Sequence, residues 1–92
     1  MKLFTVLPCT IRFKQLPIVD IEGNEHPQDV AAPIGNTLFN LADDVAEHDL
    51  GIKIYHEGDA GTEIDEKEAV ILTKYLPCFK YNLREAIKKA LS

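Results

Sequence analysis

The sequence predicts an α+β domain in which an N-terminal antiparallel hairpin or small sheet is followed by three to four helices packed on it. β-branched and aromatic residues are concentrated in the first third of the chain, whereas apolar residues recur at helical spacing in the remainder. Strands that precede helices in this way are typical of α+β domains and not of parallel α/β sheets. The 92 residues, 46% of them hydrophobic, suffice for a single domain over 1–92 with one core.

Two segments near the N-terminus have the composition of strands. They are "LFTVL" at 3–7 and "TIRFK" at 10–14, and Pro8 between them predicts a bend or a strand edge. In the second segment Ile11 and Phe13 alternate with basic residues, which predicts one buried and one solvated face. We therefore expect two short strands at the start of the domain.

The segment "LPIVDIEGNEHPQDV" at 16–30 predicts a hairpin centred on "EGNE". Gly23-Asn24 supplies a turn able to reach positive φ. The returning strand contains Pro27, which has no backbone N–H and is therefore expected to limit its pairing.

A helix is predicted after a break at 33–35. Asn36 or Thr37 can cap this helix, because a side-chain oxygen at the N-cap accepts a hydrogen bond from a free N–H of the first turn. Apolar residues then recur at helical spacing, at Leu38, Leu41, Ala42, Val45 and Ala46.

The next segment, 48–58, fits two structures. Apolar residues alternate from Leu50 to Ile54, as in a strand, but these two residues are also four apart, as on one face of a helix. We favour a short helix, because Asp49 can cap it and Gly58 can end it.

The last third of the chain predicts two helices. Asp65 and Glu68 form the D-x-x-E pattern of a capping box at the start of a helix over 66–76, which the following proline ends or kinks. The final helix, 78–91, has an apolar stripe opposite its positive charges. The stripe consists of Phe79, Leu83, Ala86, Ile87 and Ala90.

The core is expected to combine the strands with the inner faces of these helices, because each element has an apolar side that must be buried. Its predicted members are Phe4, Val6, Ile11, Phe13, Ile21, Leu38, Leu41, Val45, Ile54, Val70, Leu83 and Ile87.

Metal binding is the first chemistry to consider, because "HEGDAGTEIDEKEA" at 56–69 looks like half of a calcium-binding loop. If Gly61 takes the glycine position of such a loop, His56, Gly58 and Ala60 fall where oxygen ligands are needed, and none of them supplies a hard oxygen. The possible zinc ligands lack the close spacing of a structural site. They are Cys9, His26, His48, His56 and Cys78. The sequence predicts no metal site and no cofactor, and it predicts that this stretch turns the chain.

A cysteine nucleophile is the other chemistry to consider. Cys78 follows Pro77 at a predicted helix start, where the helix dipole lowers a thiol pKa, and His48 or His56 is a candidate base. We favour reduced, buried side chains for Cys78 and Cys9. The sequence contains no phosphate-binding glycine-rich loop, dinucleotide fingerprint or nucleophile elbow. We therefore expect a protein that is not an enzyme.

Charge and hydropathy narrow the range of partners. The net charge is −5, whereas a duplex nucleic acid requires a basic face, so we expect no such partner. No apolar run approaches the ~18 residues needed to cross a membrane, and "MKLFTVLPC" lacks the pattern of a signal peptide. We expect a cytoplasmic protein with no membrane partner.

Two charged surfaces are candidate binding sites. The middle of the chain is acidic and predicts a partner-binding acidic face of Asp43, Asp44, Glu47, Asp49, Glu57, Asp59, Glu63 and Glu66. The final helix is basic and offers an alternative anion-binding site of Lys80, Arg84 and Lys88, with Tyr81 or Tyr75 to stack on a base.

The stretch from 20 to 72 resembles, in general character, small proteins encoded by bacteriophages and integrated mobile elements. The residues that carry this resemblance are Gly35, Asn36, Leu38 and Phe39, then Ile54, Tyr55 and Gly58, then Asp65, Glu66 and Glu68. The resemblance implies a phage or prophage accessory protein and carries over no catalytic residue.

These observations predict a non-enzymatic phage or mobile-element protein that binds a protein partner, either a virion component or a host defence factor. One alternative is an oligomeric sponge that sequesters a nucleotide signal of host defence between its subunits. Another is an acidic mimic that occupies the nucleic-acid groove of its target. A homo-oligomer is compatible with each of them.

Overall fold

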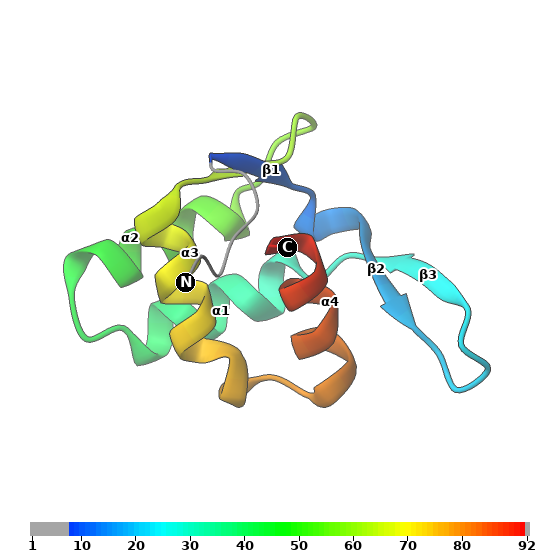
Figure 1. Cartoon of the computed structure of the whole chain (residues 1–92). Coiled ribbons are helices and arrows are strands. Elements are labelled where there is room, and N and C mark those ends of the chain that lie inside the picture. The colour runs from blue at the N-terminus through cyan, green and yellow to red at the C-terminus, as the bar shows by residue number, and fades with distance from the viewer. Residues whose placement is uncertain (1–7, 92) are drawn as a thin grey trace.

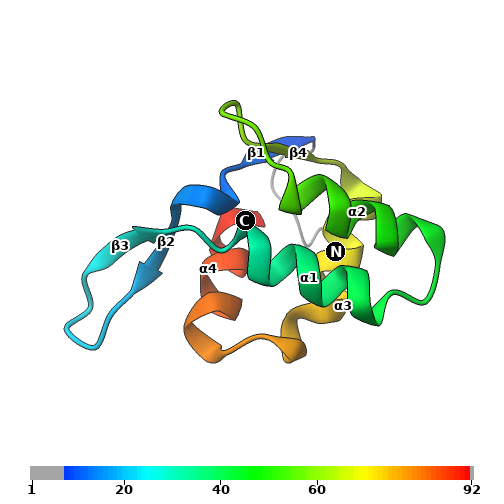
Figure 2. The ribbon, with the colours of Figure 1, turned by 180° about the vertical axis from the view of Figure 1, so that it is seen from behind.

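The computed structural model describes residues 8–91 and has the predicted α+β architecture (Figure 1). Within these residues, four α-helices follow an N-terminal hairpin, and the strands form two antiparallel two-stranded sheets. Figures 1 and 2 show the hairpin projecting from one side of the helical body. The predicted strand at 3–7 and the predicted core residues Phe4 and Val6 lie outside the described residues.

The first sheet joins the first described strand to a strand in the second half of the chain. Strand β1 (Cys9–Ile11) pairs with β4 (Thr62–Ile64), the brief strand before α3. A turn at 58–61 leads into β4, with the Gly61 N–H donating to the Gly58 carbonyl at 3.0 Å and Gly61 at a φ of +86°. The segment that looks like half of a calcium loop therefore turns the chain, as predicted.

The predicted strand at 10–14 is shorter than expected. It ends at Ile11, and Phe13–Gln15 forms a 3-10 turn, η1. The cause is Glu57, whose carboxylate accepts the backbone N–H groups of Phe13 and Lys14, each at 2.9 Å. These two donors are thereby taken from any further strand pairing.

The predicted hairpin is confirmed. Strand β2 (Leu16–Val19) pairs with β3 (Glu25–Gln28), and Pro17 lies directly opposite Pro27. Neither proline has an N–H, so this pair cannot be one that exchanges hydrogen bonds, and both ring nitrogens face away from the partner strand. Proline thus removes an outward donor from each edge of the β2–β3 ribbon.

The helices are α1 (Ala31–Leu41), α2 (Val45–Tyr55), α3 (Glu66–Tyr75) and α4 (Tyr81–Leu91), with a 3-10 turn, η2 (Leu76–Cys78), before α4. The helical interpretation of 48–58 is correct, and the capping box at Asp65 and Glu68 is confirmed by both of its hydrogen bonds. No helix among residues 8–91 is long and apolar enough to cross a membrane.

Three helix starts differ from prediction. Helix α1 begins at Ala31, because Pro33 is tolerated in a first turn that needs no N–H there, and the Asp29 carboxylate accepts the Ala31 N–H. The expected break at 33–35 is therefore absent. Helix α2 is capped by Asp44 instead of Asp49, and α4 begins three residues later than expected, after η2.

The core lies between the helices and the two sheets. Five predicted members are buried, and Leu83 is partly buried against them. The five are Ile11, Phe13, Leu38, Ile54 and Ile87. The buried set also includes Ile34, Leu50, Ile64 and Leu72, which come from α1, α2, β4 and α3.

Four predicted core residues are exposed, and each prediction was wrong for a local reason. Ile21 lies in the hairpin turn and not in a strand, so it has no layer to pack against. Leu41 and Val45 flank the turn between α1 and α2, where the chain reverses direction. Val70 lies on the outer side of α3, because Ala69 and Leu72 face inward.

Candidate functional site

Helices α1 and α2 form an antiparallel hairpin that is packed unusually closely at its centre. A Cβ added at Gly35 would lie 2.8 Å from the Gly51 carbonyl oxygen, and one added at Gly51 would lie 2.8 Å from the Gly35 carbonyl oxygen. Neither glycine has a positive φ, so both are required by close approach of the backbones and not by conformation. Figure 2 shows this pair of helices facing the viewer.

The outer face of this hairpin is apolar. The inward residues of α2 include Leu50, Gly51 and Ile54, so the opposite face presents a stripe at spacings of three, four and three residues. The stripe consists of Val45, His48, Ile52 and Tyr55. Asn36 and Phe39 of α1 run beside it, and α1 contains no charged residue at all.

A hollow lies above the glycine crossing. Its volume is about 160 Å³, and it is lined by Gly35, Asn36, Phe39, Gly51, Ile52, Tyr55 and His56. A more open hollow of about 350 Å³ continues from Phe39 toward the α1–α2 turn, where Ala42, Asp43, Asp44, Val45 and His48 line it. We call the two together the α1–α2 groove. The two hollows meet at Phe39, which lines both.

The aromatic side chains of the groove are held by ring contacts. The Phe39 ring lies 4.3 Å from the His48 ring, centroid to centroid, which ties α1 to α2 on the outer face. Tyr55 and His56 form an edge-to-face pair at 5.1 Å. Even so, 46% of the Phe39 surface, 46% of the Tyr55 surface and 39% of the Ile52 surface remain exposed.

The charge beside the groove is negative. The lining contains the two carboxylates Asp43 and Asp44 and no lysine or arginine. Asp43 contacts the ammonium of Lys74 on α3 at 3.0 Å, and the Asp44 carboxylate accepts the Glu47 N–H at the start of α2. Asp49 lies next to the stripe, with 67% of its side chain exposed. Lys53 is turned toward Glu63 and Glu68, whose oxygens its ammonium contacts at 2.5 Å and 3.0 Å.

The structure divides the predicted acidic face into exposed and buried members. Asp43, Asp44 and Asp49 lie along the α1–α2 hairpin, whereas Asp59, Glu63 and Glu66 lie on the turn before β4, on β4 and at the start of α3. Two members, Glu47 and Glu57, are buried. These two were wrongly predicted to belong to an exposed face, because their hydrogen-bond partners come from residues distant in sequence.

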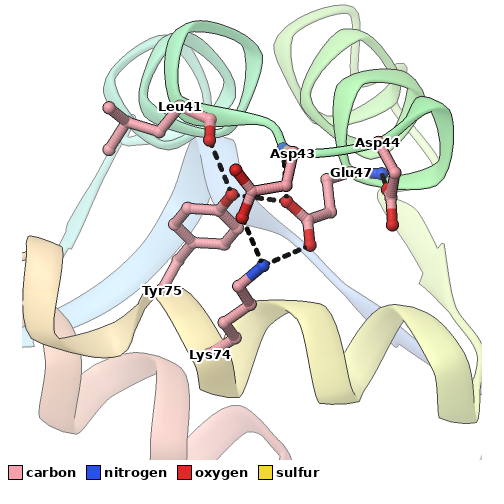
Figure 3. Close-up of polar contacts among 6 residues, drawn as sticks. All are labelled: Leu41, Asp43, Asp44, Glu47, Lys74 and Tyr75. Atoms are coloured by element: carbon pink, nitrogen blue, oxygen red, sulfur yellow. Dashed lines mark hydrogen bonds and ion pairs between the residues drawn. The ribbon is translucent and has the colours of Figure 1, made fainter.

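Glu47 joins α2 to α3 (Figure 3). Its carboxylate accepts from the Asp43 N–H at 2.9 Å, the Lys74 ammonium at 2.7 Å and the Tyr75 hydroxyl at 2.5 Å. These donors, the Asp43 N–H foremost, lower the pKa of Glu47 to about 2. The same carboxylate raises the pKa of Tyr75 to about 12 and is the largest cause of the raised pKa of Lys74. The buried Glu47 carboxylate thus links the α1–α2 hairpin to α3 through the half-exposed ammonium of Lys74 and the hydroxyl of Tyr75.

Glu57 has a similar structural role at the other end of α2. Besides the N–H groups of Phe13 and Lys14, it accepts the Thr62 hydroxyl at 2.6 Å. Two backbone N–H groups from the beginning of the domain and a hydroxyl from β4 therefore meet on one buried carboxylate. Glu57 is satisfied by these contacts and is not exposed for a partner.

The alternative basic site is partly assembled on α4. Arg84 lies over the exposed Tyr81 ring at 5.8 Å, and Lys88 contacts Glu85 at 3.3 Å. Lys80 is exposed just before the helix. The other predicted stacking residue, Tyr75, is buried, and its hydroxyl contacts Glu47, so it cannot stack on a base.

The possible metal ligands form no cluster among residues 8–91. No three His, Cys, Asp or Glu side chains of this part converge on a common point. Both cysteines are free thiols; Cys9 is half-buried, with its pKa raised by burial, whereas Cys78 is exposed and was wrongly predicted to be buried. His26 contacts Asp20 at 2.6 Å in the hairpin turn.

The groove was not found from the sequence, although two signals for it are present there. One is the spacing of Val45, His48, Ile52 and Tyr55; the other is the absence of charge from 31 to 41. Val45 was instead assigned to the core, because a single chain position does not say which of two apolar faces is covered.

Comparison with known protein families, with curated proteins and with solved structures gave no match. The residues of this chain therefore carry the functional interpretation by themselves.

Proposed function

We propose that this chain is a non-enzymatic protein-binding module that contacts its partner through the α1–α2 groove. One observation carries the proposal. Four of the nine large apolar side chains that are exposed within residues 8–91 gather on this one face, around a hollow between rigidly packed helices. They are Phe39, Val45, Ile52 and Tyr55. Exposed apolar patches with aromatic members are typical of protein interaction sites.

The exposed acids are a second part of the proposed surface. Asp43, Asp44 and Asp49 stand beside the groove. A partner that covers the apolar side chains is therefore also exposed to the electrostatic potential of these carboxylates. Charges at the rim of an interface mainly set the association rate and the choice of partner. The apolar groove therefore supplies the contact area in this proposal, and the carboxylates supply selectivity.

The biological setting is a separate part of the proposal. A role as a bacteriophage or mobile-element accessory protein, acting in the host cytoplasm on a virion component or a defence factor, rests on the resemblance of 20–72 alone. It stays a prediction, because no match with a known protein tests it.

The nucleotide sponge remains as a second candidate because of Arg84 and Tyr81. A guanidinium over an exposed aromatic ring is a pairing that also occurs where proteins bind nucleotides. Tyr75 no longer contributes to this site. The acidic-mimic alternative is weakened, because Glu47 and Glu57 are used inside the fold.

The proposal is tested by comparing the partner proteins that the wild type and matched variants capture from a lysate. The tagged chain is incubated with a lysate of its native cell, and the retained proteins are measured by native mass spectrometry. Tyr55→Ala removes an exposed tyrosine from the groove, and Tyr81→Ala removes an exposed tyrosine from α4. We expect the wild type and Tyr81→Ala to retain the same protein and Tyr55→Ala to lose it.

Two results would contradict this function. One is a retained protein that is unaffected by Tyr55→Ala and by Ile52→Asp, since both substitutions change the groove. The other is an oligomer with bound mass of nucleotide size that disappears in Tyr81→Ala, which would move the function to the basic helix.

A further inference from the structure

We propose that the occupant of the α1–α2 groove is a single amphipathic α-helix of a partner protein, with one bulky apolar anchor and basic flanks. This inference rests on the proposed function and makes its partner specific. It follows from the backbone of the groove, the size of the hollow and the charges beside it.

The backbone of the groove favours a helix over an extended segment. Both walls are α-helices, whose N–H and C=O groups are bonded within the helix away from its ends. An extended segment laid in the groove would find no backbone partners, and its own polar groups would be buried unpaired. A helix brings these groups already satisfied and needs only side-chain contacts.

The spacing of the α2 stripe fits such a helix. Val45, His48, Ile52 and Tyr55 follow the alternating three- and four-residue spacing that helices use when they pack side by side. Phe39 and Asn36 of α1 form the second wall. The partner helix would therefore lie along the furrow between α1 and α2, as the third member of a three-helix arrangement.

The hollow at the glycine crossing determines the size of the apolar side chain with which the partner helix can be anchored. Its volume is about 160 Å³. A cavity of about 150 Å³ with apolar walls holds a benzene molecule. Gly35 and Gly51 line the hollow and place no side chain in it. One phenylalanine or leucine side chain of the partner fits this space.

The charge distribution favours basic residues on the flanks of the partner helix, and it argues against a second copy of this chain as the occupant. The groove lining has the carboxylates Asp43 and Asp44 and no lysine or arginine, and Asp49 stands beside its middle. Lys74 pairs with Asp43, so Asp44 and Asp49 supply most of the negative charge that a partner meets. A symmetric contact between two copies would bring like charges together, because each copy presents the same acidic patch. Lysine or arginine on both flanks of a partner helix complements the patch instead.

The test uses synthetic peptides and the full chain. The probe is a fluorescein-labelled peptide of about 14 residues, four helical turns, with leucines on one face, a central phenylalanine and lysines on both flanks. A second peptide has glutamate in place of every lysine, and a third has the first composition in scrambled order. Binding is measured by fluorescence anisotropy at low and at high salt.

We expect the lysine peptide alone to bind and its affinity to fall with salt. Ile52→Asp and Phe39→Ala should each weaken it by about tenfold or more, as for central interface residues. Asp49→Lys should weaken it by a smaller factor, because rim charges contribute little. Asp59→Lys, on the turn before β4, should leave it unchanged, and so should Tyr81→Ala. Circular dichroism of each variant checks that the fold survives.

Three outcomes would overturn the inference. The first is equal binding of the scrambled or glutamate peptide; the second is binding that Ile52→Asp and Phe39→Ala leave intact. The third is a dimer of the chain alone, seen by sedimentation equilibrium and lost in Ile52→Asp, which would make a second copy the occupant. If no peptide binds but Tyr55→Ala still loses a captured protein, the groove binds a partner of another kind, and only the helix inference fails.

Discussion

The α1–α2 pair and the β2–β3 ribbon both expose apolar side chains, but only one of them presents a surface that a partner can use. Proline occupies the outward N–H position of each edge of the ribbon, at Pro17 and Pro27, and the Asn82 side chain of α4 donates to the Val19 carbonyl of β2. The helix pair has no open backbone edge, and its apolar side chains surround a hollow. Apolar residues of the ribbon therefore lie on strands whose edges are protected, whereas those of the helix pair surround the groove that we propose as the binding surface.

The same contrast separates the two faces of the helix pair. Leu38 and Ile54 face the core and are fully buried, whereas their chain neighbours Phe39 and Tyr55 face outward and stay half exposed. A helix turns about 100° per residue, so adjacent residues can belong to different surfaces. Stability is expected to depend on the inner face and binding on the outer one.

The largest effect is expected from substitution of the inner face. Leu38→Ala should lower the free energy of unfolding by about 2–5 kcal/mol, because it leaves a cavity in a close-packed core. Phe39→Ala should cost about 1 kcal/mol or less, because half of the ring is already in water. Urea denaturation followed by circular dichroism measures both. Equal losses for the two variants would mean that the faces are not distinct.

The next effect is expected at the glycine crossing. Gly35→Ala should lower the free energy of unfolding by about 1–3 kcal/mol, because the new Cβ would meet the Gly51 carbonyl and the Tyr55 Cβ at 2.8 Å. Gly58→Ala is the matched control, since nothing lies within 4 Å of its Cβ position. A Gly35→Ala variant as stable as the control would show that the helices separate easily and that the groove is not rigid.

A smaller effect, with a pH signature, is expected where the helix pair joins the body. The folded pKa of Glu47 is about 2, below its ordinary value of 4.5, so the ionised carboxylate stabilises the fold above pH 4.5. This contribution is lost as the pH falls toward 2. Glu47→Gln should therefore be less stable than the wild type at pH 7, and the gap should narrow from pH 5 to pH 2.

Thermal unfolding at several pH values measures that gap. Glu57→Gln is a useful comparison, because Glu57 is also buried but accepts from two backbone N–H groups and a hydroxyl and not from a lysine ammonium. A gap between the wild type and Glu47→Gln that stays constant down to pH 2 would mean that ionisation of the Glu47 carboxylate adds no stability.

Local rules predicted most of the fold. The capping box at Asp65 and the hairpin turn at Gly23 are recognisable because their partners lie within a few residues. Glu57 was unpredictable for the opposite reason, since it bonds Phe13 across 44 positions of the chain. The errors at Ile21 and Val70 arose where an apolar residue alone did not indicate which side is covered.

The candidate site was predicted only in part. The negative charge of Asp43 and Asp49 was visible in the sequence, but the groove was not, because it depends on the close approach of Gly35 to Gly51. Glu47 was counted as surface charge, although Lys74 and Tyr75 bury it from another helix. The charge of a residue can be predicted from the sequence alone, whereas a groove forms only when two helices pack against each other.

The smallest change in stability, but the sharpest test of the ribbon, is expected from its two prolines. Replacing both Pro17 and Pro27 with valine should cost about 0.4–1 kcal/mol per site, because a proline that fits its backbone restricts the unfolded chain. The valines restore one outward N–H on each edge, so strands of separate molecules can pair. Analytical ultracentrifugation should therefore detect concentration-dependent association in this variant. Pro33→Ala, in the first turn of α1, removes a proline without opening a strand edge. This variant should therefore show no more association than the wild type. If the valine variant also shows no more association than the wild type, some feature other than the two prolines protects the ribbon. The contrast between the ribbon and the groove would then no longer depend on the edges of the ribbon.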